Sequence, residues 1–496
     1  KINQIIKPKS SVLSYLHGDI IEFEVLSRKR KGFYYANIIS LLEREKTEYV
    51  GILQKNKNFA FTVIENKNIH TDIFIPSTNI NGAKDGDKVI VKILDWRAQD
   101  LSPIGNIIKI LGKPGDHETE IESILALNNV NINFSNEVIE YAENINENIE
   151  KEEVDKRRDF RDVLTFTIDP IDAKDFDDAL SFKKIDNDNY EIGIHIADVS
   201  HYVKPGTLLD KEAYSRATSI YLVDRVIPML PEKLSNKVCS LRPNEEKLTF
   251  SISIVVDKKG KIKEHWFGRT IINSNHRFSY QEAQEIIENR NNIISKEVSL
   301  TGKEYLVEEE VVEAIILMDE IAKHNRKKRE LNGAINFNKK EVFFKLDNEK
   351  NPIKVLLKES KDANKLIEEF MLIANKKVAE LFSEVKKQKY IYRVHDLPDN
   401  EKLKSLKYIA KSFGYTLDLT SSKGISKSLN KLLKDIKDKD EQNLIESLIL
   451  RSMSKAEYST NNIGHYGLSF VNYTHFTSPI RRYPDILVHR LLQDIM

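Results

Sequence analysis

Residues 163–183 read Val163-Leu-Thr-Phe-Thr-Ile-Asp-Pro-Ile-Asp-Ala-Lys-Asp-Phe-Asp-Asp-Ala-Leu-Ser-Phe-Lys183. An apolar run over 163–168 and another over 180–183 enclose an acidic stretch, and a third apolar run covers 190–196. Short apolar runs bounded by polar residues are typical of strands. The segment therefore predicts neighbouring strands, the first two of which are joined by an acidic loop.

Helical patterns dominate the chain beyond these strands. Ser279-Tyr-Gln-Glu282 has the form of a capping box, which satisfies free backbone groups at the start of a helix. Residues 304–331 have helical spacing that stops before Gly333, and 362–387 and 426–452 predict one further helix each. Strands followed by helices predict a mixed α+β domain from residue 161 to residue 496.

The acidic loop is the most informative segment for chemistry. It holds five carboxylates in ten residues, at Asp169, Asp172, Asp175, Asp177 and Asp178. Crowded carboxylates repel one another, so a rigid loop of this kind indicates a hard divalent cation, Mg²⁺ or Mn²⁺ before Zn²⁺. The loop lacks the glycine and the final glutamate of an EF-hand. The alternative is a solvent-exposed acidic turn, but the apolar residues on both sides place this loop at strand ends.

A second segment, Phe476-Thr-Ser-Pro-Ile-Arg-Arg-Tyr-Pro-Asp485, places two arginines beside Ser478 and ahead of Pro484, which suits the start of a helix. Such a pair can clamp a phosphate, although a surface salt bridge is the commoner use of arginine. Carboxylate-bound cations together with a guanidinium are the components of phosphodiester hydrolysis.

His195-Ile-Ala-Asp198-Val-Ser-His201 is a rival candidate for a zinc site. On a strand, however, His195 and Asp198 lie on opposite faces, which argues against shared ligation. The sequence contains no Walker A motif, G-x-G-x-x-G, HExxH or G-x-S-x-G, so the nucleotide-driven and serine-hydrolase classes lose their usual support.

The N-terminal part contains an internal repeat, because Gly18-Asp-Ile-Ile-Glu-Phe-Glu-Val25 returns as Gly86-Asp-Lys-Val-Ile-Val-Lys-Ile93. Alternating strands around the second copy predict a small closed barrel of the OB type, and the first copy lacks its early strands. Phe59, Phe61 and Phe74 fall on these strands. Exposed rings on such a barrel stack with unpaired bases, whereas any single ring can also belong to the core.

The composition of the whole chain is that of a globular protein, with 496 residues, 40% hydrophobic, 31% charged and a net charge of +1. Net charge alone therefore does not indicate nucleic acid. Cys239 is the single cysteine, which excludes an intramolecular disulfide framework and fits a reducing cytoplasm. No apolar stretch approaches the roughly 20 residues of a membrane span. We expect a cytoplasmic protein without a membrane partner.

Several of these motifs resemble the RNB catalytic domain of the ribonuclease II and ribonuclease R family of 3′→5′ exoribonucleases. The resemblance rests on residues 169–178, Val199-Ser-His-Tyr-Val203, Ile227-Pro-Met-Leu-Pro-Glu-Lys-Leu-Ser-Asn236 and the segment from Tyr473 to Asp485. The segments 222–225 and 241–244 look like the bacterial ribonuclease R branch. The preceding residues resemble cold-shock domains.

The resemblance implies a domain order. Residues 1–48 match the C-terminal part of a first cold-shock domain, 49–114 a second one, 115–160 an acidic helical linker and 161–496 the RNB domain. Nothing resembling the family's S1 domain follows, so we expect an internal piece of a longer protein. The family also implies single-stranded RNA as the partner and a monomeric state.

Roles for individual residues also follow from the resemblance alone. Asp169, Asp175 and Asp178 match the magnesium-site aspartates, with Mn²⁺ as a substitute, and Asp177 and Arg481 match the catalytic aspartate and the arginine on the scissile phosphate. The remaining matches are to residues that contact the RNA strand: Tyr221, Tyr280, Phe337, Glu369 and Arg482. Spacing favours Glu369 over Glu368 for the contact with the terminal ribose.

The function implied is processive 3′→5′ hydrolysis of single-stranded RNA to nucleoside 5′-monophosphates by two metal ions, in RNA turnover and quality control. The alternative from another class is a catalytically silent RNA-binding protein of RNB type, and a metal-dependent DNA nuclease is a third. The intact set of aspartates favours the enzyme, because a silent relative should have lost some of them.

Overall fold

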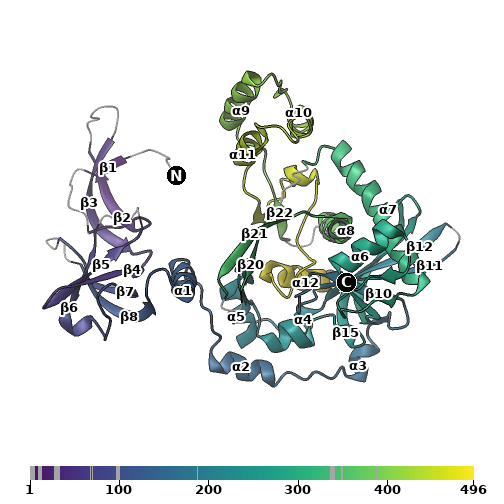
Figure 1. Ribbon diagram of the computed structural model, residues 1–496, viewed down its shortest axis with the longest axis horizontal. Coiled ribbons are helices and arrows are strands. Elements are labelled where there is room, and N and C mark those ends of the chain that lie inside the picture. The colour runs from purple at the N-terminus through teal and green to yellow at the C-terminus, as the bar shows by residue number, and fades with distance from the viewer. Residues whose placement is uncertain are drawn as a thin grey trace. The chain divides into compact units, whose positions relative to one another are not determined.

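The computed structural model describes residues 6–8, 14–26, 34–66, 69, 71–96, 101–186, 188–335, 341–347, 350–385 and 389–496. It divides into two compact units, one of Lys1–Asn133 with Leu346–Asn351 and one of Phe134–Lys345 with Pro352–Met496. Figure 1 labels the elements of both units.

The first unit contains a small sheet and a closed barrel. The sheet has the order β1 (Ile6–Pro8), β3 (Tyr34–Glu43), β2 (Ile20–Val25). The barrel has the order β4 (Glu48–Lys55), β5 (Phe59–Ile64), β6 (Ile73–Pro76), β8 (Ile104–Gly112), β7 (Lys88–Asp95), with the short 3₁₀ helix η1 (Ser77–Asn79) after β6. Inward-facing side chains such as Leu53, Ile75 and Val91 fill the barrel because they alternate with outward-facing ones along each strand. The predicted OB-type barrel is confirmed.

In the sequence, three helices lie between the barrel strands and those of the large sheet: α1 (His117–Leu127), α2 (Asn136–Glu143) and α3 (Lys151–Val154). Within the first unit, α1 packs on the barrel, where Lys88 of β7 lies 2.8 Å from Glu120. Helix α2 begins at Ser135, whose hydroxyl accepts a hydrogen bond from Val138 N.

A seven-stranded sheet forms the centre of the second unit. Its order is β17 (His276–Ser279), β10 (Thr165–Asp169), β11 (Asp178–Lys184), β12 (Asn189–Ala197), β15 (Glu246–Asp257), β16 (Ile262–Asn273), β9 (Arg158–Asp159). The β10–β17 and β16–β9 pairs are parallel, and the other neighbours are antiparallel. The three strands predicted around the acidic loop are present as β10, β11 and β12.

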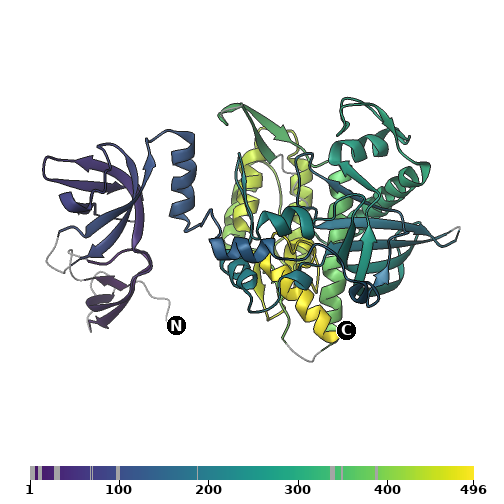
Figure 2. The same ribbon diagram turned by 90° about the horizontal axis from the view of Figure 1, so that it is seen from below.

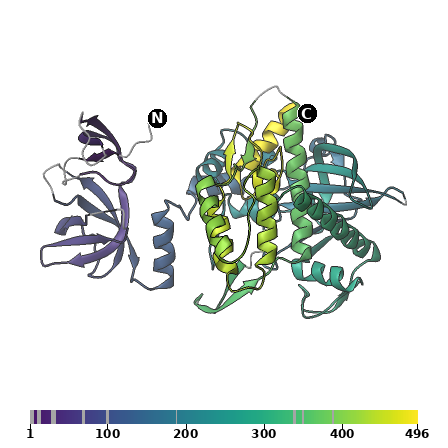
Figure 3. The ribbon, with the colours of Figure 1, turned by 90° about the horizontal axis from the view of Figure 1, so that it is seen from above.

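Both faces of this sheet contribute to a buried apolar core, and neighbouring residues of β11 enter different cores. Leu180 and Phe182 of β11 join a core with α6 (Tyr280–Asn289), α7 (Glu309–Leu331) and α8 (Asp362–Glu384). Ala179 joins the opposite core, which includes α4 (Val199–Tyr202), α5 (Leu208–Arg216) and the π-helix η2 (Lys233–Val238). Helix α12 (Tyr483–Ile495) contributes to both. Figures 2 and 3 show the sheet and its helices from two opposite sides.

The capping box predicted at Ser279 opens α6 as expected, with Ser279 Oγ accepting from Glu282 N and the Glu282 carboxylate accepting from Ser279 N. The remaining short elements are the strand pairs β13 (Ile220–Tyr221) with β14 (Val226–Ile227), β18 (Ile293–Ile294) with β19 (Tyr305–Leu306), β20 (Glu341–Leu346) with β21 (Pro352–Lys358) and β22 (Tyr392–Val394) with β23 (Glu457–Ser459), and the 3₁₀ helix η3 (Tyr466–Leu468).

The single helix predicted over 426–452 is wrong. The structure has two helices there, α10 (Ser422–Asp435) and α11 (Gln442–Ser452), with α9 (Asn400–Ser412) ahead of them. The chain reverses between α10 and α11 at Asp438, which has a φ of 61°. The reversal lets Leu429 and Ile445 enter one small core with residues of α9. Figure 1 shows the three helices α9, α10 and α11 together in its upper part.

Candidate active site

The acidic loop connects two adjacent antiparallel strands of the large sheet. Asp169 is the last residue of β10 and Asp178 is the first residue of β11. Because these two strands pair with each other, the loop begins and ends at the same edge of the sheet. The side chains of Asp177 and Asp178 are buried, with exposed fractions of 2% and 8%. The alternative of a solvent-exposed acidic turn is therefore wrong for these two residues.

Asp177 contacts the second sequence motif directly. Its Oδ1 accepts a hydrogen bond of 2.9 Å from the backbone N–H of Ile480, and its Oδ2 lies 3.1 Å from Arg481 Nε. The Arg481 side chain remains 45% exposed, and its Nη2 donates to Ser478 Oγ at 3.0 Å. Two motifs some 300 positions apart in the sequence thus form one site.

Burial changes the protonation of the aspartates. Loss of hydration raises the pKa of Asp177 to about 8, although the positive charge of Arg481 acts in the opposite direction. Burial also raises the pKa of Asp178 to about 6 and that of Asp169 well above its ordinary value, the latter with a contribution from the charge of Asp178. These carboxylates need a cation or a proton, and one guanidinium does not balance them all.

The segment 217–221 lies beside Arg481 and fixes its backbone. The Arg481 carbonyl accepts a hydrogen bond of 3.0 Å from Ser219 N and another of 3.0 Å from Thr218 Oγ1. Two residues later, the hydroxyl of Tyr221 donates to Asp175 Oδ2 at 3.1 Å, and the Tyr221 ring is 54% exposed. The structure therefore brings Tyr221, Asp175 and the arginine motif to one place.

Tyr280 lies next to the aspartates, because Asp169 pairs with Ser279 across the parallel strands β10 and β17. Its ring is partly buried, and the charges of Asp178 and Asp169 add to burial in raising the pKa of its hydroxyl. Tyr280 is thus available to contact a group bound at the acidic loop.

The other predicted contacts are placed less directly. Glu369 is buried in α8 and forms an ion pair with Arg329, whereas Glu368 is 54% exposed. Arg482 donates to both carboxylate oxygens of Asp485, at 3.0 and 2.8 Å. Phe337 lies outside the described residues. Substrate contacts by Glu369, Arg482 and Phe337 stay predictions.

The residues at this site suit a divalent cation in charge and in donor type. Asp169 Oδ2 is buried and accepts no hydrogen bond, so it has lone pairs available for a ligand, whereas the buried Asp177 Oδ2 has the ion pair with Arg481. In the described part of the chain, however, no three His, Cys, Asp or Glu side chains converge on a common point for an ion. Asp177 and Asp175 are instead held by Arg481 and Tyr221.

Arg277 and Ser240 belong to this site although the sequence analysis did not single them out. Arg277 Nη2 donates to the carbonyl oxygens of Pro170, Ile171 and Ala173, and Ser240 Oγ bonds to the backbone of Lys174 and Phe176. Both residues bond to main-chain atoms of the loop. Contacts of this kind require no particular partner side chain, so no sequence motif indicates them.

The rival histidine group is a set of structural hydrogen bonds. His195 is buried, with Nδ1 2.7 Å from Ser251 Oγ and Nε2 2.8 Å from Ser181 Oγ, and burial lowers its pKa to about 3. Asp198 lies 2.8 Å from Arg157 instead. His195 and Asp198 thus have separate hydrogen-bond and ion-pair partners in the fold.

In the first unit, the three predicted aromatics form a cluster on the barrel. The rings of Phe59, Phe61 and Phe74 have centroids 5.6–5.8 Å apart, because Phe61 pairs with Phe74 across β5 and β6. Phe59 is 36% exposed and the other two rings are half-buried. They form a surface platform and not the barrel interior.

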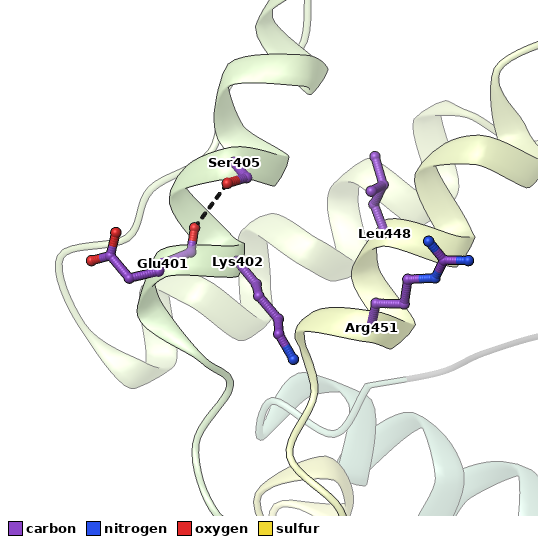
Figure 4. Close-up of a pocket in the computed structure, with 5 residues that line it drawn as sticks. All are labelled: Glu401, Lys402, Ser405, Leu448 and Arg451. Carbon is purple, nitrogen blue, oxygen red and sulfur yellow. Dashed lines mark hydrogen bonds between the residues drawn. The ribbon is translucent and has the colours of Figure 1, made fainter. Parts of the chain in front are cut away.

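Figure 4 shows a hollow between α9 and α11 that is lined by Glu401, Lys402, Ser405, Leu448 and Arg451. It contains none of the predicted site residues. Among the helices that the structure describes, none is long and apolar enough to span a membrane.

Comparisons with known proteins identify the family of the chain. The RNB domain model matches residues 157–496, and a cold-shock domain model matches residues 61–135. The first of these matches covers more than half of the chain, so the chain belongs to the RNB family.

Within that family the similarity is to ribonuclease R. The chain is 37% identical over 493 residues to Ribonuclease R of Thermotoga maritima. The aligned region covers 99% of this chain and 67% of the relative. The structure of Mycoplasma genitalium RNase R in complex with ribose methylated single-stranded RNA matches with a TM-score of 0.86 at 29% identity, over 96% of this chain and 73% of that one. Yeast Ssd1, a pseudonuclease, shares the fold, with a TM-score of 0.68 at 22% identity. The match covers 94% of this chain and 57% of Ssd1.

Proposed function

We propose that this chain hydrolyses single-stranded RNA from its 3′ end, releasing nucleoside 5′-monophosphates processively. The observation that carries the proposal is the contact of the buried Asp177 with Ile480 N and Arg481, which puts carboxylates and an exposed guanidinium in one place. Similarity to ribonuclease R over nearly the whole chain supports it. The chain spans about two thirds of the length of that relative, so the proposal concerns the part that is present.

The metal in this proposal is Mg²⁺, with Mn²⁺ as a substitute. Asp169, Asp175 and Asp178 would hold it, and the orphaned oxygen of Asp169 supports this assignment. A divalent pair at such a site supplies activation of water and neutralisation of the charge that develops on the departing 3′-oxygen.

Arg481 acts on the phosphate itself. Its side chain is 45% exposed although it contacts Asp177, so its guanidinium can donate to a non-bridging oxygen of the scissile phosphate while Asp177 holds it in orientation. Burial raises the pKa of Asp177 to about 8, and the charge of Arg481 and the hydrogen bond from Ile480 N offset only part of that effect, so a bound cation would favour the charged form.

The RNA strand would be held by stacking and by its ribose. Tyr221 offers a half-exposed ring beside the acidic loop, with Phe337 as its predicted partner, and stacking of a base is worth roughly 1–3 kcal/mol whichever base it is. Tyr280 and Glu369 would contact the terminal ribose, and a bond to the 2′-hydroxyl is the means of choosing RNA over DNA. Arg482, through its position next to Arg481, would support the same strand.

A catalytically silent RNA-binding protein is the second candidate, because the pseudonuclease Ssd1 shows that this fold occurs without nuclease action. The presence of Asp169, Asp175, Asp177, Asp178 and Arg481 favours the enzyme. We place the activity in the cytoplasm, since Cys239 is a free buried thiol, and we expect a monomer. The four-part domain order, with boundaries at 48, 114 and 160, is likewise part of the proposal.

Incubation of a 5′-labelled oligoribonucleotide with the protein, in Mg²⁺ and in EDTA, tests the proposal. A descending ladder that ends in a short residual oligomer and disappears in EDTA supports it. A shifted but uncut band would support the silent RNA-binding protein, and equal degradation of the matching oligodeoxyribonucleotide would support the DNA nuclease.

A further inference from the structure

The loop that carries the aspartates has almost no hydrogen bonds of its own. Between the end of β10 at Asp169 and the start of β11 at Asp178, its internal backbone bond in the described structure is the turn from Ala173 N to Pro170 O at 3.1 Å. Five carboxylates in this segment repel one another. Something outside the loop must therefore hold it in shape.

Arg277 holds the first half of the loop. It lies on β17, paired with Thr167 of β10, so its guanidinium is next to the point where the chain leaves the sheet. Its Nη2 lies 2.9 Å from the carbonyl oxygen of Ile171 and 3.3 Å from those of Pro170 and Ala173. One amino group thus draws three backbone carbonyls together.

Ser240 holds the second half of the loop. It is fully buried, and its Oγ donates to Lys174 O at 2.7 Å and accepts from Phe176 N at 3.0 Å. The next residue, Leu241, donates its backbone N–H to Phe176 O at 3.0 Å. The uncharged Ser240 side chain thus pairs a backbone donor, Phe176 N, and a backbone acceptor, Lys174 O, that have no partner within the loop.

The two anchors meet at Phe176, between Asp175 and Asp177. The Phe176 ring is buried, and the Arg277 guanidinium lies 4.9 Å from its centre, while Ser240 fixes its backbone. The side chains of Asp175 and Asp177 therefore start from a main chain that is already positioned before any ligand arrives.

We propose that Arg277 and Ser240 are positioning residues, which preform the acidic loop so that a divalent cation binds without reordering it. The inference rests on the proposed function for its cation, but the anchoring itself does not. Neither residue touches substrate in this assignment, because both bond to main-chain atoms of the loop or to Phe176.

A charge effect and an anchoring effect predict different outcomes. The positive charge of Arg277 also lowers the pKa of Asp169, and a positive charge by itself opposes the binding of a cation. If charge were its role, Arg277→Lys would behave as wild type, Arg277→Gln would bind cations more tightly and Ser240→Ala would change nothing. If anchoring is its role, all three variants weaken cation binding, because each removes hydrogen bonds to the loop.

The test is hydrogen exchange of peptides covering 170–178, together with Mn²⁺ binding measured by electron paramagnetic resonance, in the absence of RNA. We expect exchange in this loop to be faster in Arg277→Lys and Ser240→Ala and unchanged elsewhere, and Mn²⁺ affinity to fall roughly tenfold, the size of effect seen for groups that orient metal ligands. Arg290→Lys, an exposed arginine paired with Glu320, is the matched control.

Wild-type exchange in the loop, or wild-type Mn²⁺ affinity, in both Arg277→Lys and Ser240→Ala would overturn the inference. Thermal unfolding shows whether a variant is folded, and the smaller Ser240→Ala change keeps the test available if an Arg277 variant is not. A wild-type protein that exchanges slowly in this loop but cuts no RNA would refute the proposed function and leave the anchoring intact.

Discussion

The barrel of the first unit and the centre of the second both carry residues suited to RNA, but by opposite physical means. Phe59, Phe61 and Phe74 form a partly exposed apolar cluster without charge. Asp177 and Asp178 are charged groups buried beside Arg481. A ring platform can bind any base and needs little around it, whereas buried carboxylates are tolerable only with a cation, a proton or hydrogen bonds. We therefore expect substitutions of the barrel rings to change RNA affinity and substitutions of the buried aspartates to change the rate of RNA hydrolysis.

Asp177→Asn should give the largest difference between its effect on RNA turnover, which we assign to the second unit, and its effect on RNA affinity. The substitution keeps the side chain's size but removes its charge, so we expect turnover of RNA to fall by roughly 10³-fold or more while RNA affinity is kept. Single-turnover kinetics and fluorescence anisotropy measure the two quantities. Asp172→Asn, in the same loop but exposed, is the control and should remain active. An active Asp177→Asn protein would contradict the role of this residue.

Arg481→Lys should have the next largest effect, since a lysine keeps the charge but loses the planar fork that bonds to both Asp177 and Ser478. We expect a loss of about 10²-fold in kcat, with a small change in KM. Arg451→Lys, on the hollow of Figure 4, serves as the control. If KM rises and kcat does not fall, Arg481 acts in binding and the contrast with the barrel is lost.

The buried carboxylates also make stability depend on pH, which the barrel rings do not. Because the pKa of Asp177 is raised to about 8 and that of Asp178 to about 6, the folded protein retains protons between about pH 4 and pH 8 that the unfolded chain releases. Without metal, Asp178 should therefore lower the free energy of unfolding as pH rises from about 4 to 6, and Asp177 as pH rises from about 4 to 8, each by at most about 1.4 kcal/mol per pH unit.

Urea unfolding in EDTA at pH 5 to 8 measures this dependence. Asp177→Asn should gain stability relative to wild type as pH rises, and Mg²⁺ should stabilise wild type more at pH 8 than at pH 5. Asp186→Asn is the control, because hydrogen bonds from Asn189 lower the pKa of that exposed carboxyl. A constant difference between Asp177→Asn and wild type across the range would contradict the assigned pKa.

Phe59→Ala should have the smallest effect, and only on binding. Loss of one ring of the cluster removes part of a stacking platform, so we expect RNA affinity to fall by about 1 kcal/mol, or roughly fivefold, with kcat on a short substrate unchanged. Phe23, an exposed ring on the neighbouring small sheet, gives the matched control Phe23→Ala. A fall in kcat with wild-type affinity would show that the barrel serves another purpose.

The strands around the acidic loop, the OB barrel and the opening of α6 could be predicted because each has a local pattern: period-two alternation or a serine followed by a glutamate three residues later. The break between α10 and α11 was missed although the sequence carries a signal for it, because residues 437–443 are all polar and interrupt the apolar spacing that Leu432 and Ile436 begin and Ile445 and Ile449 resume. Helix α9 was missed although Leu403, Leu406 and Ala410 carry helical spacing.

The candidate site was predictable to the extent that its chemistry lies in side chains clustered in the sequence, as at Asp169–Asp178 and Arg481. Contacts between distant segments were not, such as Ile480 N on Asp177 or Tyr221 on Asp175. Arg277 and Ser240 have no motif because their partners are carbonyl and amide groups, which every residue possesses.

The bond between Asp177 and Ile480 N has a consequence for synthesis of the protein. The two residues are separated by 303 positions, so a nascent chain carries its acidic loop for most of the translation of this unit before the amide and guanidinium that complete the site emerge. At ribosomal speeds of about 5–20 residues per second, that interval is tens of seconds. During it the growing polypeptide, which is made along an RNA template, has no assembled means of cutting RNA.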